Sequence, residues 1–212
     1  MRVAKSGATA GSTAVSRAFL GGFAVAGLLA AGLPAAAQAP AGNGQDKMTA
    51  EPKAEDRRGV QPAAARAVLR NAKGEDIGLA TLRTAHRGIL IRIEARGLPP
   101  GPLGMHFHAV GRCEPPFESA GVHFNPGSRA HGLTARRGAH AGDMPNLIVP
   151  ASGEVSVEIV NPAVSLRTGP RNTLFDADGT ALVIHAGPDD HHTDPAGNSG
   201  ARIACGVVER AE

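Results

Sequence analysis

Residues 88–94 read Gly-Ile-Leu-Ile-Arg-Ile-Glu, and this run alternates before it ends near the turn residue Gly97. A period of two predicts a β-strand with one buried face. Similar short runs recur, punctuated by turn residues, at 67–70, 77–83, 105–110, 155–160, 180–185 and 202–208. The sequence Asn71-Ala72-Lys73-Gly74 predicts a hairpin between the first two of them. Because no long amphipathic helix pattern is present, the chain is expected to form an all-β sandwich or barrel.

Two segments interrupt this rhythm of short strands. Gly111–Asn146 and Ala186–Gly200 are long, polar and rich in Gly and Pro. Loops of this length in a compact domain tend to be either functional or disordered. These two carry most of the histidines, which favours function.

The N-terminus has the pattern of a secretory signal peptide. Basic residues precede the apolar run 18–33, which is followed by small residues that suit a peptidase. We expect residues 1–37 to be removed by a cut after Ala37. A cut after Ala39 is the alternative, but it would leave Pro40 directly downstream, which is unfavourable. No cysteine lies nearby to accept a lipid, so the mature protein is expected to have no membrane anchor and to be periplasmic or secreted.

Residues 38–62 have hardly any large apolar side chains and many Pro, Gly and charged residues, which predicts a disordered linker. The remaining residues, 63–212, are enough for one domain with a single core. Whether this domain is a monomer or a homodimer is left open by the sequence.

The charge pattern argues against nucleic acid as a partner. The whole chain has a formal charge of +3, but residues 1–37 contain three Lys/Arg and no Asp/Glu, so the rest of the chain is formally neutral. Beyond the signal there is no Trp or Tyr, and the stacking surface that single-stranded nucleic acids need is missing.

The two cysteines, Cys113 and Cys205, both lie beyond the signal. An even count in an exported protein predicts that they pair, because disulfides persist outside the cytosol. Two separate buried thiols are the alternative.

His106 and His108 occupy positions i and i+2 of a predicted strand, so both side chains point to the same face. Neutral imidazole is the commonest protein ligand for copper and zinc. Alone, however, such a pair is more often structural or exposed.

The first long loop adds three imidazoles and a carboxylate, from His123, His131, His140 and Asp143. Four N, O or S ligands without water are typical of a structural zinc site, and the ion would give shape to a loop that has few large apolar residues. A solvated polar loop is the alternative, but it does not predict this spacing. A further histidine, His185, ends an apolar strand, where it could be a ligand or a satisfied core residue.

Taken together, these segments resemble the copper/zinc superoxide dismutases from about Ala67 to Val208. The match includes, in order, GMHFHAVGRC, SAGVHFNP, the stretch from His131 to Asp143, LVIHAGPDD and GNSGARIACGVV. The resemblance implies a Greek-key β-sandwich or barrel of about eight antiparallel strands. It also implies that Cys113 and Cys205 form the family disulfide.

By the same resemblance, two metal ions are expected in each chain. Copper would be bound by His106, His108, His123 and His185. Zinc would be bound by His123, His131, His140 and Asp143. His123 would therefore bridge the two ions, and Asp189 would accept hydrogen bonds from His106 and His131.

The implied reaction is the conversion of superoxide to dioxygen and hydrogen peroxide by cycling of copper between Cu(II) and Cu(I). His123 would deliver a proton as general acid, and Arg202 would attract the anionic substrate to the copper. An ordinary surface arginine is the alternative interpretation of Arg202.

Two other classes of function stay open as alternatives, namely a copper or zinc carrier and a structural adhesion module. The full set of seven ligands argues against both. The surplus histidines, His86, His191 and His192, are expected to be solvated, with a weak third metal site at the last two as a minor alternative.

Overall fold

The computed structural model describes residues 64–212. The predicted signal peptide (1–37) and linker (38–62) lie outside the described residues, as does the first residue of the predicted domain (63–212). Within the described range, strands and one short 3-10 helix, Glu118–Ala120, make up the regular structure. The strands are β1 (Ala65–Asn71), β2 (Asp76–Thr84), β3 (Ile89–Ala95), β4 (Gly101–Leu103), β5 (Met105–His108), β6 (Leu147–Val149), β7 (Val155–Asn161), β8 (Ala181–His185), β9 (Arg202–Val207) and β10 (Glu209–Arg210).

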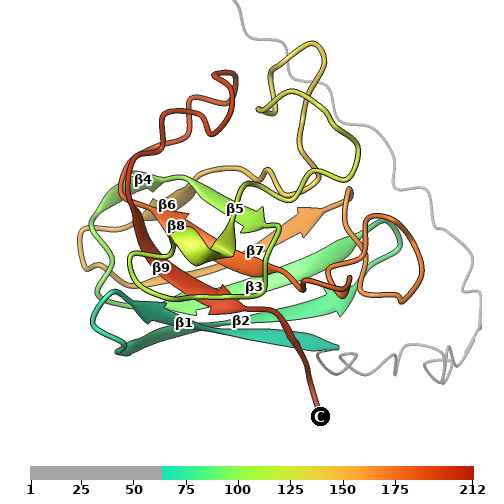
Figure 1. Ribbon diagram of the computed structural model, residues 1–212. Coiled ribbons are helices and arrows are strands. Elements are labelled where there is room, and N and C mark those ends of the chain that lie inside the picture. The colour runs from blue at the N-terminus through green and yellow to red at the C-terminus, as the bar shows by residue number, and fades with distance from the viewer. Residues whose placement is uncertain (1–63) are drawn as a thin grey trace, which may run out of the picture. The chain divides into compact units, whose positions relative to one another are not determined.

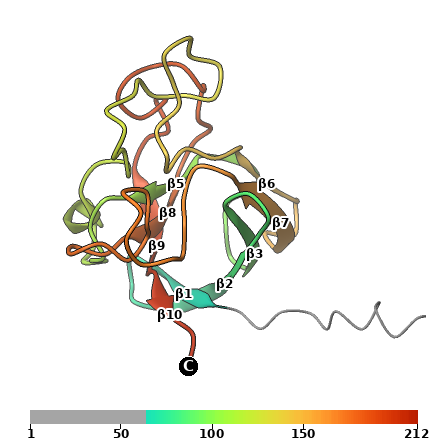
Figure 2. The same cartoon turned by 90° about the vertical axis from the view of Figure 1, so that its right-hand side faces the viewer.

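Eight of the strands form one sheet, and every pair of hydrogen-bonded neighbours in it is antiparallel. The order is β5-β8-β9-β1-β2-β3-β7, with β10 also paired to β1, while β4 and β6 form a separate antiparallel ribbon. In Figure 2 the strands are arranged around a centre, with β1 and β2 at the bottom, β3 and β7 on one side and β5, β8 and β9 on the other. The all-β class predicted from the sequence is therefore confirmed.

The strands follow the predicted hydrophobic alternation. In β3, Ile89, Ile91 and Ile93 are fully buried, while the residues between them are partly or wholly exposed. The predicted hairpin joins β1 and β2, and Asn71 closes it by accepting hydrogen bonds at Oδ1 from the backbone N–H groups of Lys73 and Glu75. All seven predicted runs are strands. Strands β4, β6 and β10 were not predicted from the sequence, because runs of two or three residues are too short to show a hydrophobic period.

Strands β5 and β8 are buried on both faces. Met105 and Phe107 point into the main hydrophobic core, together with Leu182 and Ile184 from β8. The alternate residues of β5, both histidines, point to the other face, where the long loops cover them. This face of the sheet is the floor of the site.

The two long segments are loops, as predicted, and large parts of both project above the strands at the top of each view (Figures 1 and 2). Residues 109–146 contain no strand within this structure, and their only helix is the single 3-10 turn. Residues 186–201 are irregular throughout. Among residues 64–212, no helix has the length and apolarity needed to cross a membrane.

The predicted disulfide is present and joins Cys113, in the first loop, to Cys205 on β9. It lies beside a small apolar cluster that contains the buried side chains of Phe117 and Val183. The bond thus fixes the start of the first loop to the sheet.

We expect replacement of both Cys113 and Cys205 by alanine to lower the free energy of unfolding by about 4 kcal/mol, because the bond closes a loop across 92 residues. Urea unfolding of the metal-free protein measures this difference. A reductant should destabilise the wild type and leave the double variant unchanged. A difference below about 1 kcal/mol would contradict the prediction.

Candidate metal centre

Three groups of buried side chains each bring their ligand atoms within 4.8 Å of one another, and the smallest of them consists of His106, His131 and Asp189. The four-histidine set consists of His106, His108, His123 and His185. The aspartate set consists of His123, His131, His140 and Asp143. His123 belongs to both sets. The structure therefore gathers all seven residues that the sequence singled out as ligands.

Local pairing explains why residues far apart in the sequence meet at β5. The first long loop returns twice alongside this strand: the backbone N–H of Phe124 donates to the carbonyl of Phe107, and the N–H of Phe107 donates to the carbonyl of Gly142. These bonds place His123 opposite His108 and Asp143 opposite His106 as isolated β-bridges. His185 comes from the neighbouring strand, β8, which pairs with β5.

In the four-histidine set, backbone carbonyls fix two of the rings. Nδ1 of His108 lies 2.9 Å from the carbonyl oxygen of Gly121, and Nδ1 of His185 lies 3.1 Å from that of Gly200. Because a carbonyl only accepts, each Nδ1 carries the proton of its ring. The two Nε2 atoms then face each other across 3.4 Å, each with an unprotonated lone pair. Two lone pairs at this distance repel each other unless a cation lies between them.

His106 and His123 complete this set with one free nitrogen each. Nδ1 of His106 and Nε2 of His123 are buried and have no hydrogen-bond partner among residues 64–212. The other nitrogen of His106, Nε2, lies 2.7 Å from Oδ2 of Asp189. Buried polar atoms without a partner are rare and call for an explanation, and an ion is one of the standard ones.

Burial keeps three of these rings neutral at pH 7. Desolvation lowers the pKa of His106 and that of His185 to about 4, and it lowers the pKa of His108 to about 2. A neutral imidazole is the form that binds a metal, so the set is ready to act as ligands at neutral pH.

The aspartate set is arranged around one carboxylate oxygen. Oδ1 of Asp143 lies 3.1 Å from Nδ1 of His123, 3.1 Å from Nδ1 of His131 and 3.4 Å from Nδ1 of His140. Its Oδ2 accepts hydrogen bonds from the backbone N–H groups of Gly132 and His140. Burial alone would raise the pKa of Asp143, but the hydrogen bonds from the surrounding histidines outweigh it and hold the pKa well below its usual range.

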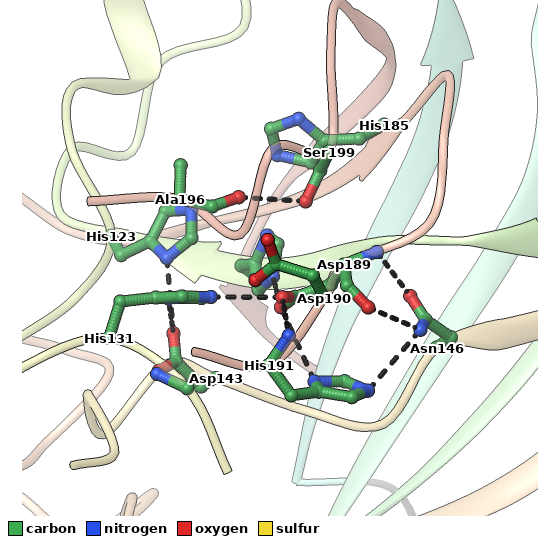
Figure 3. A network of polar contacts seen from close by, with 12 residues as sticks. His123, His131, Asp143, Asn146, His185, Asp189, Asp190, His191, Ala196 and Ser199 are labelled. Carbon is green, nitrogen blue, oxygen red and sulfur yellow. Dashed lines mark hydrogen bonds and ion pairs between the residues drawn. The ribbon is translucent and has the colours of Figure 1, made fainter. Parts of the chain in front are cut away.

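Asp189 connects the two sets, because its carboxylate contacts one histidine of each (Figure 3). Its carboxylate contacts Nε2 of His106 at 2.7 Å and Nε2 of His131 at 3.0 Å, which are the two contacts predicted from the sequence. Gly197 packs against this pair, and a Cβ on it would overlap both the carboxylate and the ring of His131. His106 donates its Nε2 proton to Asp189 and so turns an unprotonated Nδ1 toward its own set. Burial alone would lower the pKa of His131, but its hydrogen bonds to Asp143 and Asp189 outweigh burial and raise the pKa to about 9, so this ring carries both protons until an ion replaces the one on Nδ1.

The donors of both sets fit metal ions. One set offers four imidazole nitrogens, and the other offers three nitrogens and a carboxylate oxygen, which are ligand types that copper and zinc accept. Residues 77–208 match the family model described as copper/zinc superoxide dismutase. The chain belongs to the copper/zinc superoxide dismutase family.

Relatives in this family agree in sequence and in fold. A copper-zinc superoxide dismutase from Aquifex aeolicus is 54% identical over 141 residues, which are 66% of this chain and 83% of that protein. The copper-zinc superoxide dismutase of Caulobacter vibrioides is 44% identical over 148 residues, 68% of this chain and 85% of its own length. A solved structure of a superoxide dismutase-like protein from Bacillus subtilis has a TM-score of 0.66 and 43% identity, and it covers 67% of this chain and 96% of its own.

A fourth relative extends the likeness of fold to lower identity. The Cu/Zn superoxide dismutase from Brucella abortus has a TM-score of 0.58 and 28% identity, and the match covers 68% of this chain and 99% of that one. The Greek-key sandwich or barrel expected for the superoxide dismutase family is thus the fold of this member.

Arg202 of this superoxide dismutase family member lies beside the four-histidine set. Its guanidinium donates to the carbonyl oxygens of Phe117 at 2.6 Å and Gly121 at 2.7 Å, and the second of these oxygens also accepts from His108. The side chain is 15% exposed, and Glu118 forms an ion pair with it at 3.6 Å. The arginine is therefore close to the site and mostly buried, rather than an ordinary surface residue.

The prediction that the surplus histidines are solvated is correct for two of them and wrong for the third. His86 is exposed, and the side chain of His192 is 67% exposed. The side chain of His191 is only 24% exposed and lies against Asp189 and Asn146. The sequence shows no difference between the two adjacent histidines, because the direction of each side chain is set by the loop conformation. Among the described residues, none of the groups whose geometry could hold a metal ion includes His191 or His192.

Because the two sets share only His123, we expect the ions of this superoxide dismutase family member to be lost separately. His108→Ala should keep only the ion of the aspartate set, and His140→Ala should keep only the ion of the four-histidine set, so that each variant retains one ion per chain of a different element. Metal analysis after dialysis against a weak chelator measures the content. Loss of both ions in either variant would contradict two sites that bind independently, whereas His192→Ala, the exposed control, should keep both.

Proposed function

We propose that this chain is a superoxide dismutase that converts two superoxide ions and two protons to dioxygen and hydrogen peroxide. The observation that carries the proposal is the pair of adjacent buried sets, which share His123 and each gather four ligand atoms within 4.8 Å of one another. A carrier needs no such shared ring.

We assign copper to the four-histidine set and zinc to the aspartate set. Four nitrogens suit copper, and a closed set of three imidazoles and one carboxylate suits structural zinc. When bound, copper supplies the one-electron oxidation and reduction of superoxide, and zinc is redox-inactive and gives shape to the loop.

His123 is the proposed bridge and proton donor. Its Nδ1 lies 3.1 Å from Asp143, within the aspartate set, and its Nε2 is the free nitrogen on the other side of the ring. The ring is stacked on that of His106, with centroids 3.9 Å apart, which limits its rotation. Nε2 is thus the atom at which a proton can be held and then delivered to superoxide as peroxide forms, which is general acid catalysis by a fixed imidazole.

Arg202 is the proposed guide for the substrate. Its charge is permanent, and a cation near a recessed site raises the local concentration of a small anion. The contacts with the carbonyls of Phe117 and Gly121 hold the guanidinium next to the loop that contains His123.

We also propose that the protein is exported and acts in the periplasm or outside the cell. The signal-peptide pattern of residues 1–37 and the Cys113–Cys205 disulfide support this proposal.

Metal analysis of the oxidised mature protein, together with superoxide consumption measured on the same sample, tests the function. One copper and one zinc per chain with rapid consumption is the expected result. Metal held without turnover under a superoxide flux would favour a carrier instead.

Replacement of Arg202 by alanine should lower the rate of superoxide consumption about 10-fold and weaken its dependence on salt, while copper stays bound. Arg202→Lys keeps the charge and should retain part of the salt dependence. The exposed Arg87→Ala serves as the control. If the rate of superoxide consumption and its dependence on salt are both unchanged in Arg202→Ala, the arginine has no part in the mechanism.

A further inference from the structure

His191 lies at the junction of the two long loops. Its carbonyl oxygen accepts hydrogen bonds from the backbone N–H of Thr134 at 3.1 Å and from the Thr134 hydroxyl at 2.8 Å. Gly132 allows this approach, because a Cβ on it would lie 2.0 Å from the same oxygen. The main chain of His191 thus joins the loop of the aspartate set to the loop that carries Asp189.

Asn146 holds Asp189 from the opposite side. Its Nδ2 donates to the carbonyl oxygen of Asp189 at 2.9 Å, and its Oδ1 accepts from the backbone N–H of Asp189 at 2.8 Å. This pair of bonds fixes the orientation of the amide. If Oδ1 and Nδ2 were exchanged, a donor would face the backbone N–H of Asp189 and an acceptor would face its carbonyl oxygen.

The side chain of His191 completes the amide's hydrogen bonding. Nδ2 of Asn146 lies 3.2 Å from Nε2 of His191 (Figure 3), so this contact joins two nitrogen atoms, one of which must accept. An amide nitrogen can only donate, so Nε2 of His191 accepts and the ring carries its proton on Nδ1. Both hydrogens of the amide are then used, one on Asp189 and one on His191.

The only hydrogen bond from His191 to the Asp189 carboxylate comes from its main chain. Its backbone N–H donates to Oδ1 at 2.7 Å, and the protonated Nδ1 lies 3.6 Å from Oδ2, which is an electrostatic contact rather than a hydrogen bond. The same two oxygens receive the ring protons of His106 and His131. The neighbouring His192 makes none of these contacts and points to solvent.

We propose that His191 is a positioning residue that acts through Asn146. It holds Asp189 in the orientation that turns Nδ1 of His106 and Nδ1 of His131 toward their ions. The inference rests on the proposed function, since it concerns ligand geometry in the loaded protein. The chain offers a matched control in His192, because it has the same chemistry one position further along the same loop.

The test compares His191→Leu, His191→Gln and His192→Leu in the mature protein loaded with copper and zinc. Leucine removes the acceptor for Asn146, whereas the side-chain oxygen of glutamine can replace Nε2. We expect His191→Leu to weaken zinc binding about 10-fold and to shift the visible absorption of bound Cu(II). His191→Gln and His192→Leu should stay within about 2-fold of the wild type in zinc affinity and keep its spectrum.

Unfolding of the metal-free variants separates positioning from general loosening of the loop. We expect the unfolding midpoint of metal-free His191→Leu to equal that of metal-free His192→Leu. Three results would overturn the proposal. One is an equal loss of zinc affinity in His191→Leu and His191→Gln, and another is wild-type zinc binding and spectrum in His191→Leu. The third is a lowered unfolding midpoint of metal-free His191→Leu that accounts for its loss of zinc affinity.

A double variant tests the route through Asn146. If His191 acts through that amide, the variant with both Asn146→Ala and His191→Leu should bind zinc no more weakly than Asn146→Ala alone. Fully additive losses would overturn this route. Failure of the proposed function is a different result, because the wild type itself would then lack metal or turnover.

Discussion

Two imidazole nitrogens that face each other across 3.4 Å, each with its lone pair turned toward the other, form the constraint on which the rest of this structure depends. Backbone carbonyls fix the protons of both rings on the far nitrogens, and burial keeps the rings neutral. Such an arrangement is unfavourable for the protein alone and favourable around a cation. The binding energy of the ions is therefore also folding energy for the loops that surround them.

The sheet provides the rigid side of this arrangement. The period of two in β5 sends Met105 and Phe107 to the core and the intervening histidines to the opposite face, and pairing with β8 brings His185 alongside. Two of the ligands that the loops contribute, His123 and Asp143, are then placed opposite β5 by backbone bonds to Phe107. A strand that is buried on both faces cannot slip by one residue, because a slip would put the imidazoles into the hydrophobic core.

Much of this could be predicted from the sequence, because its signals are local or periodic. Alternation in 88–94 predicts a strand, and the spacing of His106 and His108 predicts a shared face. The positions of Asn146 and His191 could not be predicted in the same way. Both matter through contacts between the two loops, and His191 has a positive φ of 61° that no local pattern indicates. Nothing in the pair His191-His192 shows which ring turns inward.

The carbonyl oxygen of Gly121 is shared by Nδ1 of His108 and the guanidinium of Arg202, and it lies in the loop that the disulfide fixes to β9. One backbone oxygen thus orients both a proposed metal ligand and the cation that is proposed to attract the substrate. Sequence changes in this short segment have pleiotropic effects, because they move both groups together. If the proposed roles hold, a shift of this oxygen changes the orientation of the copper ligand and the position of the substrate-attracting charge at the same time.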